Sequence, residues 1–295
     1  MTAGSTLPIR LPPWLRRSLP PVSAVKTHST LGTYNLNTVC ESALCPNRSE
    51  CYSRKTATFM ILGDICTRSC GFCAIKAGKG LPVETDEPDR VAFAARELGL
   101  KYVVVTSVAR DDLQDEGAGH FAQTIRAIRR EIADVQIEVL TPDFHARREL
   151  IQAVVDAGPE VFNHNIETVS RLQKSVRPQA SMERSLEVLR MIKELSPVMV
   201  TKSGIMLGLG ETDEEVIEAA AALRAVQCDI LTIGQYLPPS REHLPLKNYI
   251  EPAHFKNLAD KIRPLGFKEV FAGPYVRSSY HAGEVFEHSA KSEPI

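Results

Sequence analysis

Several features that would place a chain in a common class are absent from this sequence. No apolar run approaches the roughly 20 residues that a membrane-spanning helix needs, so we expect no membrane span. Basic residues (35 Lys and Arg) nearly balance acidic ones (36 Asp and Glu), which gives no electrostatic reason to expect nucleic acid or an anionic membrane as the main partner. No tandem repeat or low-complexity tract is present, which excludes a repeat architecture.

The first 30 residues lack acidic side chains and carry four basic ones, which raises the question of organelle targeting. Their five prolines would break the amphipathic helix that such a signal needs, and no apolar stretch resembles a secretory signal. We therefore expect an extended arm on the surface of a cytoplasmic protein. Structural disulfides are not expected in that compartment.

Strand-like and helix-like segments alternate from residue 56 to about 274. The apolar, β-rich runs are 56–62, 101–108, 135–143, 160–167, 200–210 and 229–237. The helical patterns are 89–99, 119–133, 147–158, 181–195 and 212–226. This alternation predicts parallel strands with right-handed crossovers, in either a barrel or an open doubly wound sheet.

The ends of the predicted helices carry capping signals. Asp86, Ser181 and Thr212 are N-cap candidates, and Thr212 has the spacing of a capping box with Glu215. Gly99 and Gly158 suit the position just after a helix. The tail after Gly273 is polar, and we expect it to be irregular and to cross an end of the barrel.

Five of the predicted strands end in polar residues. They are Thr106, Ser107, Thr141, Asp143, Asn163, His164, Asn165, Glu167, Lys202, Ser203, Gln235 and Tyr236. Ligands of α/β folds bind at the carboxyl ends of parallel strands. One such residue could merely cap a strand, but five strands with the same feature favour a shared site.

Six of the seven cysteines lie within 34 positions, in two groups of three. The first group, spaced C-x4-C-x5-C, is Cys40, Cys45 and Cys51. The second, spaced C-x3-C-x2-C, is Cys66, Cys70 and Cys73.

Zinc usually takes four Cys or His ligands in spaced pairs, and disulfides do not suit the compartment. A [4Fe–4S] cluster accepts closely spaced thiolates, and three of them leave one iron open for a non-protein ligand. Zinc, disulfide and cluster all remain alternatives here, with the cluster favoured.

The second triad, with Phe72 before its last cysteine, resembles the signature of the radical S-adenosylmethionine (SAM) superfamily. In that superfamily the open iron is chelated by the amine and carboxylate of SAM. The resemblance implies an α/β fold, a partial (β/α)6 TIM-like barrel over residues 56–274. An N-terminal cluster-binding arm (1–55) would precede it, and a C-terminal tail (275–295) would lie across the barrel mouth.

Six longer segments resemble the lipoyl synthase family and together cover nearly the whole chain. They are TVCESALCPNRSECYSRKTATFMILGDICTRSCGFC (38–73), VTSVARDDLQDEGA (105–118), NHNIETV (163–169), TKSGIMLGLGET (201–212), TIGQYLPPS (232–240) and GPYVRSSYHAGE (273–284). The family often has tryptophan where Tyr52 stands, a conservative aromatic change.

This resemblance implies a role for each candidate residue. Cys40, Cys45 and Cys51 would hold an auxiliary [4Fe–4S] cluster, whose fourth ligand is a serine of RSSY, Ser279 rather than Ser278. Cys228 is most simply a buried core cysteine.

The expected SAM-contacting residues are Phe72, Asn163, Asn165, Glu167, Lys202 and Gln235, with Lys202 meeting the carboxylate. The glycines of GIMLGLG could let the backbone approach the cofactor. His164 would line the site or be a hydrogen-bonded core histidine, and Glu167 would meet SAM or pair with Arg177.

The implied reaction inserts two sulfur atoms, at C6 and C8 of a protein-bound octanoyl chain, to give the lipoyl cofactor. It would use two SAM molecules per turnover and consume the auxiliary cluster as sulfur donor. The catalytic set would be both cysteine triads and Ser279. The implied partners are an octanoylated lipoyl carrier domain or glycine cleavage H protein, a ferredoxin or flavodoxin electron donor, and an iron–sulfur cluster assembly or carrier protein.

Three rival functions share part of this pattern. Other radical SAM enzymes, such as biotin synthase or a methylthiotransferase, resemble the chain only at CxxxCxxC. A non-catalytic iron–sulfur electron carrier would be shorter and would ligate every iron with protein. A zinc-stabilised interaction domain would hold zinc and no sulfide.

Overall fold

The computed structural model describes residues 11–16, 24–54 and 56–291. These residues form an eight-stranded sheet in the order β1-β2-β5-β6-β7-β8-β9-β10. Its strands are β1 (Asn37–Thr38), β2 (Thr58–Ile61), β5 (Tyr102–Ser107), β6 (Gln136–Leu140), β7 (Val161–Asn163), β8 (Val200–Leu207), β9 (Ile230–Gln235) and β10 (Glu269–Gly273). Neighbours from β2 to β10 are parallel, whereas β1 is antiparallel to β2. The fold is the α/β partial barrel that the resemblance implied.

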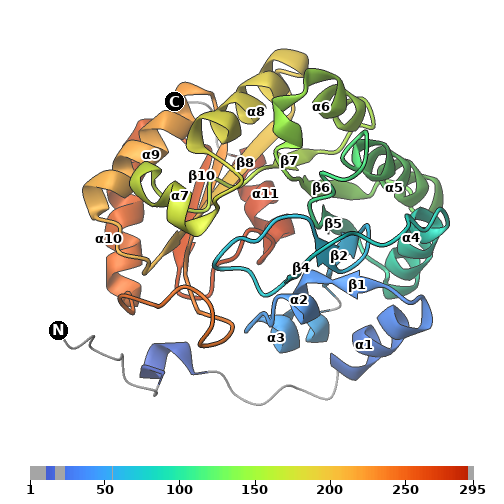
Figure 1. Ribbon diagram of the computed structural model, residues 1–295, viewed down its shortest axis with the longest axis horizontal. Coiled ribbons are helices and arrows are strands. Elements are labelled where there is room, and N and C mark those ends of the chain that lie inside the picture. Colours follow the sequence, from blue (N-terminus) through green and yellow to red (C-terminus); the bar gives the residue numbers. More distant parts are fainter. Residues whose placement is uncertain (1–10, 17–23, 55, 292–295) are drawn as a thin grey trace.

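An arc of helices covers the outer face of the curved sheet (Figure 1). Its members are α4 (Glu87–Leu98), α5 (Ala118–Glu131), α6 (Arg148–Val155), α8 (Met182–Leu195), α9 (Asp213–Ala225) and α10 (Pro252–Ile262). Every predicted strand and helix is present. The strand β10 was not predicted, because only one of its residues is buried. The helix α10 was also missed, although Phe255, Leu258, Ala259 and Ile262 have helical spacing. A separate pair of short strands, β3 (Ile65–Cys66) and β4 (Lys76–Ala77), lies beside the sheet.

Side chains of the strands divide between two buried environments. Val103, Val105, Ile137 and Val139 belong to the hydrophobic core that includes the helices. The alternating residues of the same strands face the inside of the barrel, where Glu138 is fully buried. A strand buried on both faces needs no strict alternation of apolar and polar residues, which explains the continuous apolar runs. Full burial of each core side chain stabilises the fold by about 1.5–3 kcal/mol.

The predicted helix ends are largely confirmed. Thr212 and Glu215 form a complete capping box, and the Ser181 hydroxyl accepts a hydrogen bond from the Arg184 amide. Gly99 ends α4 in the left-handed conformation, with φ of 69°. Asp86 does occupy the N-cap position of α4, but its carboxylate binds the Arg90 guanidinium instead of a backbone amide.

The predicted extended arm is wrong in the part of the N-terminus that the structure describes. Ala24–Thr33 forms the helix α1, which packs on α3 (Arg48–Ser53) and α4. The Thr27 hydroxyl donates to the Tyr52 carbonyl (2.8 Å), and the Thr30 hydroxyl donates to Glu97 (3.0 Å). Residues 1–10 and 17–23, which also belong to that prediction, lie outside the described residues. No helix in the described ranges is long and apolar enough to cross a membrane.

The C-terminal tail also departs from the prediction, because it is partly helical. Ala282–Lys291 forms α11, which Figure 1 shows in the middle of the ring of strands and helices. The Phe286 ring lies 6.0 Å from the Tyr102 ring, so α11 crosses the end of the barrel where β5 begins. The residues before α11 run along the inner face of the sheet.

Two strand glycines make room for this tail. A Cβ atom at Gly234 would lie 2.1 Å from the Val276 carbonyl oxygen, and one at Gly204 would lie 3.1 Å from the Ser278 hydroxyl. The Asn165 and Thr232 side chains also lie beside Gly204, which lines the cavity described below. A glycine inside a strand often marks such a close approach of another backbone.

We predict that Gly234→Ala lowers the free energy of unfolding by about 3 kcal/mol, because the added methyl group meets backbone rather than a movable side chain. Gly32→Ala is the matched control, since nothing lies within 4 Å of its Cβ position. In the helix α1 that change should be neutral or stabilise by about 0.5–1 kcal/mol. Denaturant unfolding of both variants measures the difference, and equal stabilities would contradict the packing described here.

Candidate active site

One cavity, of about 360 Å³, lies inside the barrel between the strands, the tail and both cysteine segments. Its cysteine and serine lining consists of Cys40, Cys45, Cys51, Cys73, Ser278 and Ser279. Its apolar lining includes Phe72, Leu140, Ile205, Met206, Leu237 and Val276. Segments more than 200 residues apart in the sequence therefore meet around one space that offers thiols, hydroxyls and an apolar wall.

The first triad is carried by two short helices. Cys40 lies on α2 (Val39–Ser42), Cys51 lies on α3, and Cys45 lies in the turn between them. The Asn47 amide donates to the Tyr275 carbonyl (2.6 Å), and the Tyr280 hydroxyl donates to Glu50 (3.0 Å). These two bonds hold the tail against the turn and helix of this triad.

The second triad begins where β3 ends, at Cys66. Its sulfur accepts hydrogen bonds from the backbone amides of Arg68 (3.4 Å) and Ala109 (3.3 Å). Further along the loop, the Gly71 amide donates to the Val176 carbonyl (2.9 Å), and Cys73 reaches the cavity wall. Amides that point at a sulfur are the surroundings expected of a thiolate or a cluster ligand.

Burial makes three of these six thiols poor acids. It raises the pKa of Cys40 to about 11, of Cys70 to about 12 and of Cys73 to about 11. Buried thiols of this kind become thiolates when a soft metal centre binds them and displaces their protons. The two triads therefore have the donor chemistry that iron–sulfur clusters require.

The geometry favours clusters over single zinc ions. Among the described residues, the one set of three metal-binding side chains with ligand atoms within 4.8 Å of one another is Asp111, Glu116 and His145. Neither cysteine triad is gathered that tightly, whereas four thiolates around zinc at about 2.3 Å would be.

The two RSSY serines differ in their partners. The Ser278 hydroxyl accepts a hydrogen bond of 2.7 Å from the Asn165 side-chain amide. No hydrogen bond links the Ser279 hydroxyl to any residue that the structure describes, although Ser279 lines the cavity. Of the two, Ser279 is thus the hydroxyl that remains available to a ligand.

Asn165 and Glu167 both line the cavity, and Asn165 brings an unsatisfied oxygen to it. The Asn165 side-chain oxygen is buried and has no hydrogen-bond partner among the described residues, while its amide donates to Glu167 (3.0 Å). Glu167 has a φ of 63°, a left-handed conformation that is costly for this residue type and concentrates at functional sites. Burial raises the pKa of Glu167, and the positive charge of Arg177 opposes that shift. A ligand with ammonium or hydroxyl groups would satisfy both side chains.

Comparisons with known proteins identify the family of this chain. The family model of the Radical SAM superfamily matches residues 60–223. A lipoyl synthase from Caldanaerobacter subterraneus is 53% identical over 93% of this chain and 96% of its own length. Lipoyl synthase 2 from Gloeobacter violaceus is 54% identical over 93% of this chain and 96% of its own. The chain belongs to the lipoyl synthase family of radical SAM proteins.

Solved structures support the fold alone. Methylornithine synthase has 15% sequence identity and a TM-score of 0.55, over 71% of this chain and 63% of its own. At that identity the likeness shows a shared fold and carries no argument about substrate.

Two of the expected SAM-contacting residues lie away from the cavity of this lipoyl synthase family member. Lys202 is 1% exposed and forms an ion pair with Glu138, at 2.9 and 3.0 Å from its two oxygens. Asn163 is fully buried and donates to the same carboxylate (3.0 Å). Glu138 faces inward from β6, two strands away from β8, and Lys202 is the third residue of β8 rather than a residue at its carboxyl end. Lys202 therefore serves as the counter-ion of Glu138 and is not a free cation.

Phe72 and Gln235 do line the cavity, but the polar atoms of Gln235 are already hydrogen-bonded within the protein. The fully buried Gln235 amide donates to the carbonyls of Leu207 and Tyr236 (3.0 Å each), and its oxygen accepts from the Ile250 amide (2.7 Å). Gln235 is therefore committed to holding the loop after β9. Phe72 is partly buried beside Leu244 and presents its ring to the cavity.

Sequence reasoning missed the loop that follows β9 as part of the site. The Leu244 amide donates to the Gly71 carbonyl (3.0 Å), and a ring nitrogen of His243 lies 3.1 Å from the Cys73 carbonyl oxygen. The Tyr236 hydroxyl donates to Leu244 (2.9 Å). This loop covers the second triad, but its polar, proline-rich sequence carries no signal beyond that of an ordinary loop.

His164 is the hydrogen-bonded core histidine rather than a residue of the cavity. Its ring nitrogens lie 2.9 Å from the Thr141 carbonyl and 3.0 Å from the Ser185 hydroxyl. Burial, together with the nearby positive charge of Arg177, lowers the pKa of His164 to about 4. The predicted ion pair between Glu167 and Arg177 is not formed by direct contact, since Arg177 donates to Asn165 and Ser185 instead. The positive charge of Arg177 still attracts Glu167 from a distance.

The shifted pKa of His164 predicts a loss of stability in mild acid. Between pH about 6.5 and about 4 the unfolded chain binds a proton at this residue and the folded chain does not. The neutral, buried His164 thus contributes about 3 kcal/mol to the free energy of unfolding. This contribution is complete above pH 6.5 and falls as the pH approaches 4. Between pH 7 and pH 5, denaturant unfolding should show a smaller loss of unfolding free energy for His164→Gln than for the parent. Equal losses of unfolding free energy would contradict this assignment.

Proposed function

We propose that the protein is a lipoyl synthase that inserts sulfur at C6 and C8 of an octanoyl chain attached to a lysine of a carrier protein. The single observation that supports this most is the common cavity of the first triad, Cys73 and Ser279, because a sulfur donor must lie within bonding reach of the carbon that is activated. The lipoyl synthases to which the chain is similar match along almost their entire length.

When bound at Cys66, Cys70 and Cys73, a reduced [4Fe–4S] cluster and SAM supply a 5′-deoxyadenosyl radical, which removes hydrogen from unactivated carbon. The backbone amides of Arg68 and Ala109 orient the first of these cysteines. We assign the ammonium or ribose hydroxyls of SAM to Asn165, whose buried oxygen has no partner among the described residues, and to the carboxylate of Glu167 beside it.

The octanoyl chain is the apolar partner in this proposal. Leu140, Ile205, Met206, Leu237 and Val276 provide a wall of matching chemistry along the cavity. Such a wall excludes water, which protects a reactive carbon centre from side reactions. It also holds the extended chain by contact area rather than by hydrogen bonds.

The auxiliary cluster is a substrate here, since its sulfides enter the product. Cys40, Cys45, Cys51 and Ser279 would hold it. A serine oxygen is a harder and poorer ligand for such a cluster than a thiolate. That weaker bond suits a cluster that must open. Two sulfur insertions use two SAM molecules per lipoyl group.

The partners follow from the same chemistry. The acyl carrier is a lipoyl domain or the glycine cleavage H protein, the electron donor is a ferredoxin or flavodoxin, and an iron–sulfur assembly or carrier protein rebuilds the spent cluster. We keep the cytoplasm as the proposed location, with neither nucleic acid nor a membrane as partner.

The two triads should separate two half-reactions. We expect Cys70→Ala to abolish methionine release from SAM, because the open-iron cluster is lost. Cys45→Ala should still cleave SAM but transfer no sulfur to an octanoylated peptide. Iron and sulfide per chain should be about eight in the parent and about four in either triple-alanine triad variant. Zinc without sulfide, or sulfur transfer by Cys45→Ala, would contradict the proposal.

The two serines provide a matched pair of variants. We expect Ser279→Ala to reduce the iron content and change the absorption of the auxiliary cluster more than Ser278→Ala does. Ser278→Ala removes only the partner of Asn165 and should leave the cluster loaded. The reverse order of effects would move the ligand role to Ser278.

A further inference from the structure

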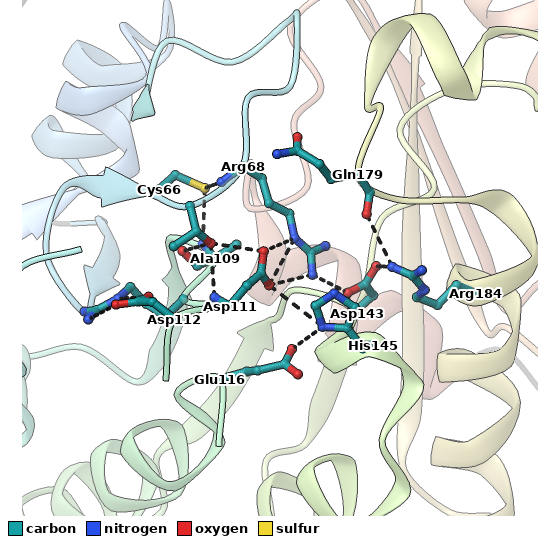
Figure 2. Close-up of polar contacts among 12 residues, drawn as sticks. Cys66, Arg68, Ala109, Asp111, Asp112, Glu116, Asp143, His145, Gln179 and Arg184 are labelled. Atoms are coloured by element: carbon teal, nitrogen blue, oxygen red, sulfur yellow. Dashed lines mark hydrogen bonds and ion pairs between the residues drawn. The ribbon is translucent and has the colours of Figure 1, made fainter. Parts of the chain in front are cut away.

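Arg68 stands inside the loop of the second triad, yet its side chain is only 7% exposed. Its Nε donates to Asp111 Oδ2 (2.9 Å), and its Nη2 donates to Asp111 Oδ1 (2.8 Å) and to Asp143 Oδ1 (2.7 Å). Figure 2 shows the guanidinium between the two carboxylates. A planar fork that binds two acids at once is a geometry that arginine provides and lysine does not.

The two carboxylates belong to loops after neighbouring strands. Asp111 follows β5, and its amide donates to the Thr67 hydroxyl (3.0 Å). Asp143 follows β6, has a fully buried side chain, and accepts from the His145 amide (3.1 Å) and from Arg184 (3.2 Å). Arg68 thereby fastens the cysteine loop to the carboxyl ends of two strands of the barrel.

The same contacts set the surroundings of Cys66. One amide that donates to its sulfur belongs to Arg68 itself, and the other belongs to Ala109. Thr67 donates to the Ala109 carbonyl through both its amide and its hydroxyl (3.0 Å each). Hydrogen bonds to cluster sulfurs stabilise the more negative, reduced state and raise the reduction potential.

These contacts also decide against a cation at Asp111, Glu116 and His145, although the three ligand atoms lie close together. Both oxygens of Asp111 already accept from Arg68, and the Arg147 guanidinium lies 3.7 Å from Glu116. The positive charge that a metal ion would bring is already supplied by arginine. We therefore interpret this group of side chains as part of the contacts that hold the loop of the second triad in place.

We propose that Arg68 is a positioning residue of the radical SAM cluster: by bridging Asp111 and Asp143 it holds the Arg68 and Ala109 amides against the Cys66 sulfur. This inference rests on the proposed function only in that a [4Fe–4S] cluster binds at Cys66, Cys70 and Cys73. It goes beyond that function by assigning the electronic tuning of the cluster to a residue that touches neither SAM nor the acyl chain.

The test compares Arg68→Gln with Arg184→Gln in the full-length, anaerobically reconstituted protein. Arg184 donates to the other oxygen of Asp143, so its loss removes one charge from the same carboxylate and leaves every bond of Arg68 in place. We expect Arg68→Gln to lower the midpoint potential of the open-iron cluster, weaken the SAM-induced change in its electron paramagnetic resonance signal, and slow methionine release 10- to 100-fold. Arg184→Gln should stay within about twofold of the parent.

Three outcomes would overturn the proposal. The first is a midpoint potential in Arg68→Gln equal to that of the parent. The second is an equal fall of the midpoint potential in Arg184→Gln, which would assign the change in potential to the charge balance of Asp143. The third is complete rescue by Arg68→Lys, which keeps the charge without the fork. Should Arg68→Gln fail to fold, the double variant Arg68→Gln/Asp143→Asn removes both charges, and a parental potential there would overturn it equally.

These readouts are separate from sulfur transfer. A parent protein that cleaves SAM but transfers no sulfur would contradict the proposed function, and the comparison of potentials would still decide the role of Arg68. The auxiliary cluster serves as an internal control, because its four irons should remain bound in the Arg68 variants.

Discussion

The close approach of the C-terminal tail to the inner face of the sheet is the constraint on which the site depends. Only glycine at position 234 leaves room for the Val276 carbonyl, and only glycine at 204 leaves room for the groups beside Ser278. Once seated there, the tail meets the first cysteine triad, since Asn47 and Glu50 bind Tyr275 and Tyr280. A serine from one end of the chain and three thiols from the other thereby share one wall.

Buried charges organise the inside of the barrel in two layers. Deeper in the barrel, Glu138 accepts from Lys202, Asn163 and Tyr102, which leaves no free charge there. At the carboxyl ends of the strands, Arg68 lies between Asp111 and Asp143 under the second triad. A buried pair contributes little net stability, but it is costly to break, so each pair holds one arrangement against alternatives.

Local signals in the sequence predicted the elements that depend on local physics. The capping box at Thr212 and Glu215 and the glycine after α4 were both found as expected, because a cap involves residues only a few positions apart. The buried strands were predicted by their apolar runs. The tail helix α11 and the helix α1 were missed, because neighbours from distant segments, such as Tyr102 for Phe286 and Tyr52 for Thr27, stabilise them.

By itself the sequence determined the parallel strands, the two cysteine triads and the family, since these depend on periodicity, on spacing and on whole segments of matching residues. The choice of a barrel over an open sheet came with the family. Only the tertiary structure decided which polar residues share the site. Lys202 and Asn165 look equally suited in the sequence, yet Glu138 on β6, two strands away from β8, neutralises the lysine. A side-chain oxygen of Asn165, by contrast, has no partner among the described residues. Pairing across strands depends on register, and register is set only when the whole sheet assembles.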